Sequence, residues 1–416
     1  MSIETTLVIL FAIATGVAIT VRWFRIPYTA GLVLAGLLLG LWHIVAPPHL
    51  TRDLLFAVFL PGLIFEAAFN IDVHAVRSSW RTISVLAVPG VILAIALTGL
   101  GTAAAMYGLD VGSHFSVRDG LVFGAVVAAT DPIAVVALFK QLRVPTRLAT
   151  LIEGESLFND GTSIVLLALL LAYAIGQESS WGHMALRFGA VVGGGAVVGL
   201  VAGLLASSLI SHIDDAMIEI TITVIAAYGS FALAEQVGGS GVIATAVAGM
   251  LCSDHARRTR MSPTTRHAVN VFWEYIAFAL NSVVFLLIGF EVHLPTLGVA
   301  WLEIGVVYLI VLMARGIVVA LATTALRQTR ERISASWNAI LVWGGLRGAL
   351  SMVLVLALPV TLPNRDLLIT LTFGIVLLSI LLQGLSMQWL LTRVGVAGSP
   401  QRDIAAQRGN GHAASS

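Results

Sequence analysis

The segment GESLFNDGTS, residues 154–163, places carboxylates, an amide and hydroxyls inside a stretch that is otherwise apolar. Residues four apart lie on one face of a helix, so Ser156 shares a face with Asp160. Glu155 and Asn159 form a second pair of this spacing on an adjoining face. The first face suits binding of a cation, and the second suits holding the helix in place. Capping and interhelical hydrogen bonds alone would account for Ser156 and Asn159, but poorly for Asp160.

A second polar cluster lies in the motif VVAATDPIAVV. Pro132 lacks an N–H and disfavours the helical conformation of the preceding residue, so we expect the helix to be interrupted at Asp131. A simple proline kink is the alternative, but an ionisable residue at the kink favours a functional site. Hard monovalent cations are held by oxygens, which Asp131 and Thr130 supply together with freed carbonyls, Ser156 and Asp160.

The motif LVWGGLRGALSMVLVLALP predicts a second interrupted helix, because Gly344, Gly345 and Gly348 weaken the helix around Arg347. Paired interrupted helices at corresponding positions of inverted repeats build the substrate sites of many transporters. No residue-by-residue repeat is detectable, so the predicted symmetry rests on the order of the helices.

Two arginines, Arg315 and Arg347, fall within predicted spans, where an unpaired guanidinium is far costlier than a paired one. Glu155 is the expected partner, and Arg347 is favoured over Arg315. Glu153 and Glu274 are weaker alternatives because they are expected near helix ends.

The elements that carry these residues are transmembrane helices. Of the 416 residues, 58% are hydrophobic and 11% charged, about half the charged fraction of a soluble domain. The single cysteine, Cys252, excludes an internal disulfide. Apolar runs and their breaks predict about thirteen helices, near residues 3–21, 28–46, 53–70, 82–106, 119–139, 148–175, 186–210, 216–236, 240–252, 269–290, 303–326, 337–359 and 367–392.

The distribution of basic residues predicts the orientation in the membrane. With the N-terminus outside, seventeen of the 23 Lys and Arg fall in inside segments and four in outside loops. We therefore expect a multi-pass protein of the cell membrane with a retained first helix and a cytoplasmic C-terminus. Residues 1–394 form the transmembrane domain, and residues 395–416 are predicted to be a short disordered tail.

A buried carboxylate that binds either a proton or a cation is itself an exchange mechanism. If the site changes sides only when Asp160 is neutralised by one of them, each cycle moves a cation one way and a proton the other. No phosphate-binding loop is present, which agrees with a secondary transporter that uses no cofactor. The types and positions of the polar and charged residues within the spans disfavour a channel, an intramembrane hydrolase and a carrier of organic anions. They also indicate no nucleic-acid partner.

Several motifs together resemble those of the NhaP-type sodium/proton antiporters, of the monovalent cation:proton antiporter superfamily. They are LPGLIFEAAFN, ATDPIAVVAL, GESLFNDGTSIV, GGLRGALSMVL and SILLQGLSMQWL. The resemblance implies an NhaA-like antiporter fold, with inverted repeats and crossing fifth and twelfth helices, in a homodimer. It also implies a dimerisation part near 1–70 and 216–290, a linker helix at 186–210 and an ion-transporting core near 82–175 and 303–394.

The resemblance also implies roles for single residues. Asp160 is the carrier carboxylate, helped by Asp131, Thr130 and Ser156, and Glu66 assists or gates the ion site. Asn159 before Asp160 matches the electroneutral branch, and Glu155 with an intramembrane arginine is the structural ion pair. The expected activity is Na⁺/H⁺ exchange. A K⁺/H⁺ antiporter of the same fold and, less favoured, a cation channel stay open, because the sequence does not distinguish Na⁺, Li⁺ and K⁺.

Overall fold

The computed structural model describes residues 3–24, 28–41, 55–111, 115–176, 180–258, 261–291, 294–329, 331 and 333–396, and this part of the chain is helical without a strand. The predicted all-α class is confirmed. Among the described residues, eight helices are long and apolar enough to cross a membrane: Trp80–Gly108, Val117–Leu142, Thr146–Ala174, Trp181–Ile210, Ala216–Gln236, Pro263–Phe290, Trp301–Ala325 and Arg365–Arg393. Shorter apolar helices are Val8–Val21, Tyr28–Leu41, Phe56–Asn70 and Gly241–Asp254. The chain is a multi-pass membrane protein, while the exact number of crossings stays a prediction.

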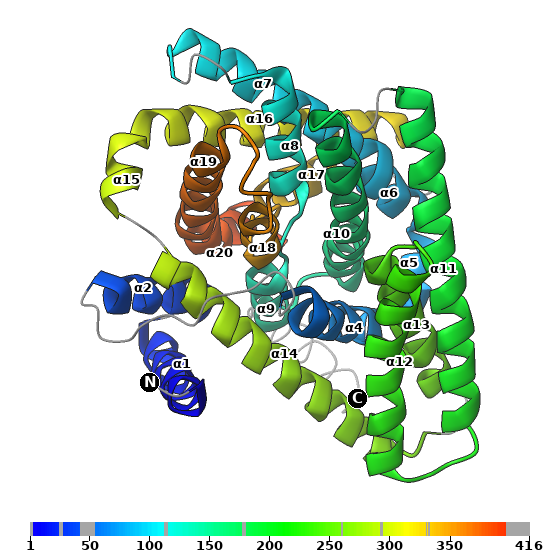
Figure 1. Ribbon diagram of the computed structural model, residues 1–416. Helices are drawn as coiled ribbons and strands as arrows, with labels where there is room; N and C mark the ends of the chain where they lie inside the picture. The colour runs from blue at the N-terminus through cyan, green and yellow to red at the C-terminus, as the bar shows by residue number, and fades with distance from the viewer. Residues whose placement is uncertain are drawn as a thin grey trace, which may run out of the picture.

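One group of helices packs around the long helix α14, which runs diagonally across the lower half of the molecule (Figure 1). Helix α14 contacts α1, α2, α4 and α12, while α13 packs on α4, α11 and α12. The bounds of this group are α1 Ile3–Phe24, α2 Tyr28–Leu41, α4 Leu60–Asn70, α11 Trp181–Ile210, α12 Ala216–Gln236, α13 Gly241–Arg258 and α14 Pro263–Glu291.

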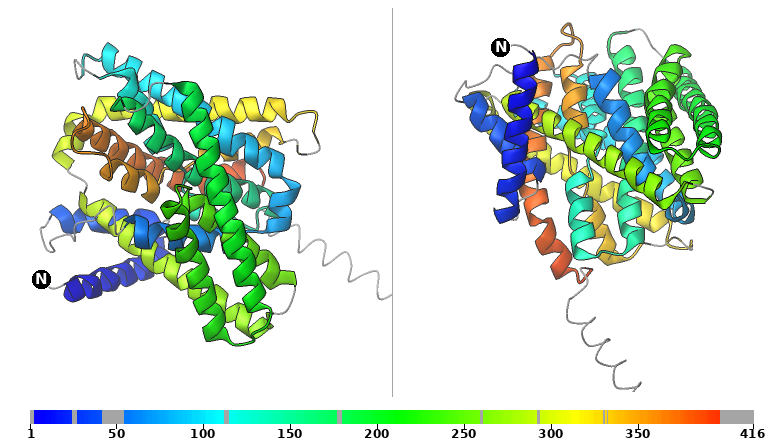
Figure 2. Two further views of the ribbon diagram at one scale, coloured as in Figure 1. Left: turned by 45° about the vertical axis from the view of Figure 1, so that its right-hand side comes forward. Right: turned by 90° about the horizontal axis from the view of Figure 1, so that it is seen from below.

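A second group carries both polar motifs and lies above α14 in the same view (Figure 1). Helix α7 packs on α8 and α16, and α19 packs on α16 and α18. Helix α10 contacts α8 in this group and α4, α11 and α13 in the other, so it lies between them (Figure 2). The bounds are α7 Val91–Gly108, α8 Val117–Ala128, α10 Thr146–Ala174, α16 Trp301–Ala325, α18 Ala349–Leu356 and α19 Arg365–Leu378.

Both predicted interruptions are confirmed. Helix α8 begins at a capping box between Ser116 and Asp119 and ends at Ala128, and α9 begins after Pro132. The second break separates α17 from α18 around Arg347. The bounds of the remaining half-helices are α9 Ile133–Leu142 and α17 Ala335–Trp343.

The described part of the chain contains three π-helical turns: η1 Leu55–Phe59, which leads into α4, η2 Leu86–Gly90, which leads into α7, and η3 Ser379–Gly384. Pro89 lies inside η2 and removes one backbone donor there. Turn η3 joins α19 to α20, Leu385–Arg393, and faces the loop between α17 and α18. The sequence did not predict these turns.

Several helices are longer than predicted, because the predicted bounds stop where polar residues such as His183, Asp254 and Arg266 interrupt the apolar run. Helix α14 begins at Pro263 instead of residue 269, α11 at Trp181 instead of 186, and α13 reaches Arg258 instead of 252. The predicted helix 28–46 ends at Leu41 in the described part, and residues 42–54 lie outside it. The predicted disordered tail lies almost wholly outside the described residues as well.

Candidate functional site

The two interrupted helices meet at their breaks. The backbone N–H of Asp131 donates to the carbonyl of Leu346 over 2.8 Å, so the two extended segments are hydrogen-bonded to each other. A Cβ atom on Gly348 would lie 2.2 Å from the Cβ of Asp131. Only glycine allows this approach, which explains why the glycine-rich motif lies at the crossing.

Four half-helix ends converge there, and charged residues offset their dipoles. The carboxylate of Asp131 accepts from the N–H of Ile133 at the start of α9, over 3.0 Å, and also interacts with the N–H of Ala349 in α18. The guanidinium of Arg347 donates to the carbonyls of Ala128 and Ala129 at the end of α8, over 2.8 and 3.3 Å. An anion therefore lies at helix N-termini and a cation at a helix C-terminus, the favourable arrangement.

The polar face of α10 is hydrogen-bonded to the break between α8 and α9. The hydroxyl of Ser156 donates to the carbonyl of Thr130 over 2.5 Å. The side-chain amide of Asn159 donates to the carbonyl of Ala128 at 2.9 Å and to the hydroxyl of Thr130 at 3.3 Å. Ser163 donates to the other end of the same amide, over 2.7 Å, and so fixes its orientation. These bonds join α10 to the break through Asn159, and its predicted role in holding the helix stays a prediction.

Asp160 differs from its neighbours because its Oδ1 atom is buried without a hydrogen-bond partner. The charges that act on it are those of Asp131 and Glu155. Thr130 and Ser156 are buried beside the same break, with exposed fractions of 6% and 2%. The structure thus groups Asp131, Thr130, Ser156 and Asp160, an all-oxygen set that fits a hard cation or a proton. Within the described residues, no group of three His, Cys, Asp or Glu fits a conventional metal site.

The predicted preference for Arg347 as the partner of Glu155 is wrong. Arg315 forms the pair, with Nη1 and Nη2 each 2.8 Å from one carboxylate oxygen of Glu155. Arg315 also donates to the carbonyl of Leu341 from Nε at 3.2 Å and Nη2 at 3.1 Å. Gly345 leaves room for this side chain, because a Cβ there would lie 2.9 Å from the Nε of Arg315.

The physical reason for the correction lies in the break itself. Ending α8 at Ala128 leaves carbonyls without helical donors, and these take the guanidinium of Arg347. Arg315, on the continuous helix α16, takes both oxygens of the carboxylate as well as the carbonyl of Leu341 in the last turn of α17. The pair is buried, with exposed fractions of 1% for Glu155 and 7% for Arg315.

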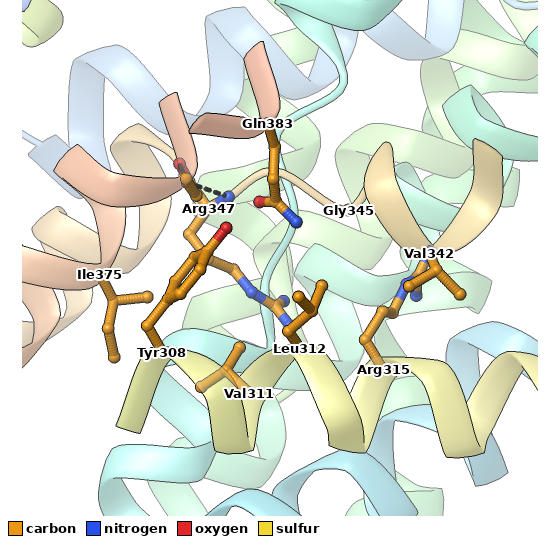
Figure 3. A pocket seen from close by; sticks show the side chains of 10 residues that line it. Tyr308, Val311, Leu312, Arg315, Val342, Gly345, Arg347, Ile375 and Gln383 are labelled. Atoms are coloured by element: carbon orange, nitrogen blue, oxygen red, sulfur yellow. Dashed lines mark hydrogen bonds between the residues drawn. The ribbon is translucent and has the colours of Figure 1, made fainter. Parts of the chain in front are cut away.

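Sequence reasoning missed Ser379, the first residue of η3. Its hydroxyl accepts from the N–H of Arg347 at 3.1 Å and lies 3.2 Å from the carbonyl of the same residue. The π-turn thereby holds the loop between α17 and α18. The cavity beside it, lined by Tyr308, Arg315 and Gln383 among others (Figure 3), has about 10 Å³ of free space, room for about one water molecule. It is too small for a larger ligand.

Glu66 lies in a different acidic group. It accepts from the amide of Asn70 over 2.7 Å, and the charges that act on it are those of Lys140, Glu274 and Glu153. Glu153 precedes Asp160 by seven residues, about 10 Å along α10. The predicted role of Glu66 in assisting or gating stays a prediction, and this position fits an approach to the site better than direct coordination.

We expect Gly348→Ala to destabilise the crossing, because the added methyl group would overlap the Cβ and the carboxyl group of Asp131, whose backbone is held by its bond to Leu346. Overpacking of this kind costs about 1–3 kcal/mol. Thermal unfolding of the purified variants in detergent would measure the loss. Gly384→Ala is the matched control, since its Cβ would meet nothing within 4 Å. Equal melting temperatures for the two variants would contradict the tight crossing.

Comparison with known proteins places this arrangement among transporters. The family model described as "Sodium/hydrogen exchanger, transmembrane" matches residues 7–393. The Na⁺/H⁺ antiporter ApNhaP of Aphanothece halophytica is 37% identical over 408 residues, covering 95% of this chain and 76% of that protein. The Na⁺/H⁺ antiporter NhaP of Pseudomonas aeruginosa is 39% identical over 355 residues, covering 84% and 82%. The structure of the sodium proton antiporter MjNhaP1 from Methanocaldococcus jannaschii at pH 8 matches with a TM-score of 0.77 at 19% identity, covering 95% of this chain and 99% of that one, which shows a shared fold.

Proposed function

Because this chain belongs to the sodium/hydrogen exchanger family, we propose that it is a secondary-active Na⁺/H⁺ antiporter whose ions compete for Asp160. The observation that carries this proposal is the buried, unpartnered Oδ1 of Asp160 beside a helix break. A buried carboxylate is costly unless a proton or a cation neutralises it. Both neutralised forms are compatible with movement through the membrane, whereas the empty anion is not.

The neighbouring residues supply ligands and rigidity in this mechanism. The hydroxyl of Ser156 donates its hydrogen bond to the carbonyl of Thr130. The lone pairs of the hydroxyl oxygen therefore stay available to a cation. Asp131 provides a second carboxylate that favours a cation over an empty site. Asn159, Arg315 and Arg347 hold the helices through hydrogen bonds that do not use Asp160.

We propose electroneutral exchange, one cation for one proton. Glu155 is paired with Arg315, and the amide of Asn159 has no titratable proton. Asp160 is therefore the carrier, which binds either a proton or a cation. K⁺ in place of Na⁺ would use the same chemistry, and the choice between them is an outcome of the transport test below.

The proposal extends to topology and assembly. The N-terminus is outside and the C-terminus cytoplasmic, as the distribution of basic residues predicts. The chain forms a homodimer through residues 1–70 and 216–290, while residues 82–175 and 303–394 move as the ion-transporting core and helix 186–210 links them. Helix α14 packs more extensively on α1, α2, α4 and α12 than on α18 of the other group, which supports this division.

A transport assay with the reconstituted wild type tests the function. Proteoliposomes with a trapped pH dye receive an imposed pH gradient, and then Na⁺, Li⁺ or K⁺ in turn. We expect Na⁺ to dissipate the gradient at a rate that an imposed membrane potential leaves unchanged. A response to K⁺ alone would assign the K⁺/H⁺ activity, and no response to any of the three in folded protein would contradict an antiporter.

Asn159→Asp tests the stoichiometry. The new carboxyl group beside Asp160 provides a second titratable proton, so we expect exchange to become sensitive to the membrane potential. The assay is the same gradient dissipation with and without a potassium diffusion potential. Ser163→Ala is the control, because it removes the bond that orients Asn159 without adding a titratable group. Voltage-insensitive exchange at the wild-type rate would show that residue 159 does not set the stoichiometry.

A further inference from the structure

A basic pocket lies at the end of the molecule where α10 begins, about 20 Å along that helix from Asp160. It has a volume of about 450 Å³ and lies between the α5–α6 region, the start of α10 and the segment before α17. These elements are α5 Val73–Ser78 and α6 Trp80–Val85, the latter below the far end of α16 in Figure 1. Its lining residues are Arg77, Ser78, Trp80, Arg81, Arg147 and Glu331.

The pocket holds uncompensated positive charge. Three arginines face one carboxylate, and the structure shows no carboxylate of the described residues within ion-pair distance of any of the three. The Nη2 atom of Arg147 is buried without a hydrogen-bond partner. An unsatisfied buried donor on a cation is costly, and an anion in the pocket would satisfy it.

The one acidic residue of the pocket is engaged elsewhere. Oε2 of Glu331 accepts from the N–H of Thr82 at 2.9 Å and from its hydroxyl at 3.1 Å. Glu331 is 8% exposed and Thr82 is fully buried. This carboxylate therefore fixes the segment before α17 to α6 and leaves the arginines free for an external anion.

The surroundings of the pocket fit a lipid surface. The residue Trp80 is 55% exposed, and the guanidinium of Arg81 lies 5.7 Å from the centre of its ring. Arg147 lies 5.6 Å from the ring centre of Trp337 in the same way. Tryptophan beside arginine is typical of the boundary between hydrocarbon and headgroups, and basic pockets between helices on the cytoplasmic side bind anionic headgroups.

We propose that this pocket binds the phosphate of an anionic phospholipid headgroup and, through it, joins α6, α10 and the segment before α17. The phosphate oxygens accept from Arg77, Arg81 and Arg147, and the acyl chains run past Trp80. The bound lipid then stabilises the elements that carry Glu155, Asp160 and Arg347 without entering the ion site.

Lipid titration of the purified protein in detergent tests the proposal. Dioleoylphosphatidylglycerol, dioleoylphosphatidylcholine and inorganic phosphate are added separately, and the dissociation constant is taken from the shift in melting temperature. We expect phosphatidylglycerol to bind and to raise the melting temperature, and phosphatidylcholine to have little effect. A shift produced equally by inorganic phosphate would assign the site to soluble phosphate compounds and overturn the lipid.

Arg77→Gln/Arg81→Gln is expected to weaken phosphatidylglycerol binding about 30-fold, since two charges are removed. Arg266→Gln/Arg393→Gln removes the same charge from other positions on the predicted inside and is expected to bind as the wild type does. Arg77 and Arg81 are exposed, so the first variant should fold; Arg147→Gln alone should also weaken binding. Equal weakening in both double variants would overturn the pocket and leave only general surface charge, and weakening in neither would overturn any role of these arginines in binding the lipid.

Discussion

Asp160→Asn is expected to lower cation-dependent proton movement to the level of protein-free liposomes. The substituted amide keeps the size of the side chain but binds no exchangeable proton in the working range and carries no charge for a cation. The loss should be the same for Na⁺, Li⁺ and K⁺, because the change removes the shared carrier and does not alter ion selectivity. Dissipation of a pH gradient across proteoliposomes measures it.

The matched control for this loss is Asp366→Asn, at the start of α19. Its carboxylate side chain is fully exposed, at 101% of the reference area, so the same chemical change there should leave the rate near that of the wild type. Unchanged melting temperatures for both variants would separate loss of transport from loss of folding. Persistent exchange in Asp160→Asn would remove Asp160 from the central role.

Breaking the Glu155–Arg315 pair is expected to cost about 3–5 kcal/mol of unfolding free energy, because each single change leaves a buried charge without its partner. Glu155→Gln and Arg315→Met make the single changes. The double variant should be more stable than the sum of the two losses predicts, since neither charge then remains. The wild type, the two single variants and the double variant form a double-mutant cycle. Unfolding of each purified protein in detergent, followed by tryptophan fluorescence, measures its unfolding free energy.

A second cycle with Arg347→Gln in place of Arg315→Met distinguishes the two arginines. Arg347 donates to carbonyls of α8, so its coupling to Glu155 should be much smaller than that of Arg315. A larger coupling for Arg347 would contradict the pairing seen in the structure.

Local chemistry explains what the sequence predicted correctly. The break at Asp131 follows from the missing N–H of Pro132, and the faces of α10 follow from the four-residue spacing of Ser156 with Asp160 and of Glu155 with Asn159. These properties depend on a few neighbouring residues. They were sufficient to place the candidate ion site at the first break.

The errors concern contacts between distant helices. Glu155 pairs with Arg315, which lies 160 positions later in the sequence. The competing Arg347 is held by carbonyls that are free of helical hydrogen bonds only because α8 ends at Ala128. Ser379 supports the second break from 32 residues away through a π-turn, for which the sequence carries no local signal beyond a motif that begins with this serine. The position of Glu66 beside Glu153 and Lys140 likewise depends on how α4 packs on α10.

The release of protons on sodium binding tests most directly whether the two ions compete for Asp160. Purified protein in weakly buffered detergent solution receives Na⁺ or an equal concentration of choline at several acid and neutral pH values, while a pH dye reports released protons and calorimetry reports bound sodium. We predict one proton released for each sodium ion bound by the wild type, and neither binding nor release in Asp160→Asn. Sodium binding to the wild type without proton release at any of these pH values would contradict the competition.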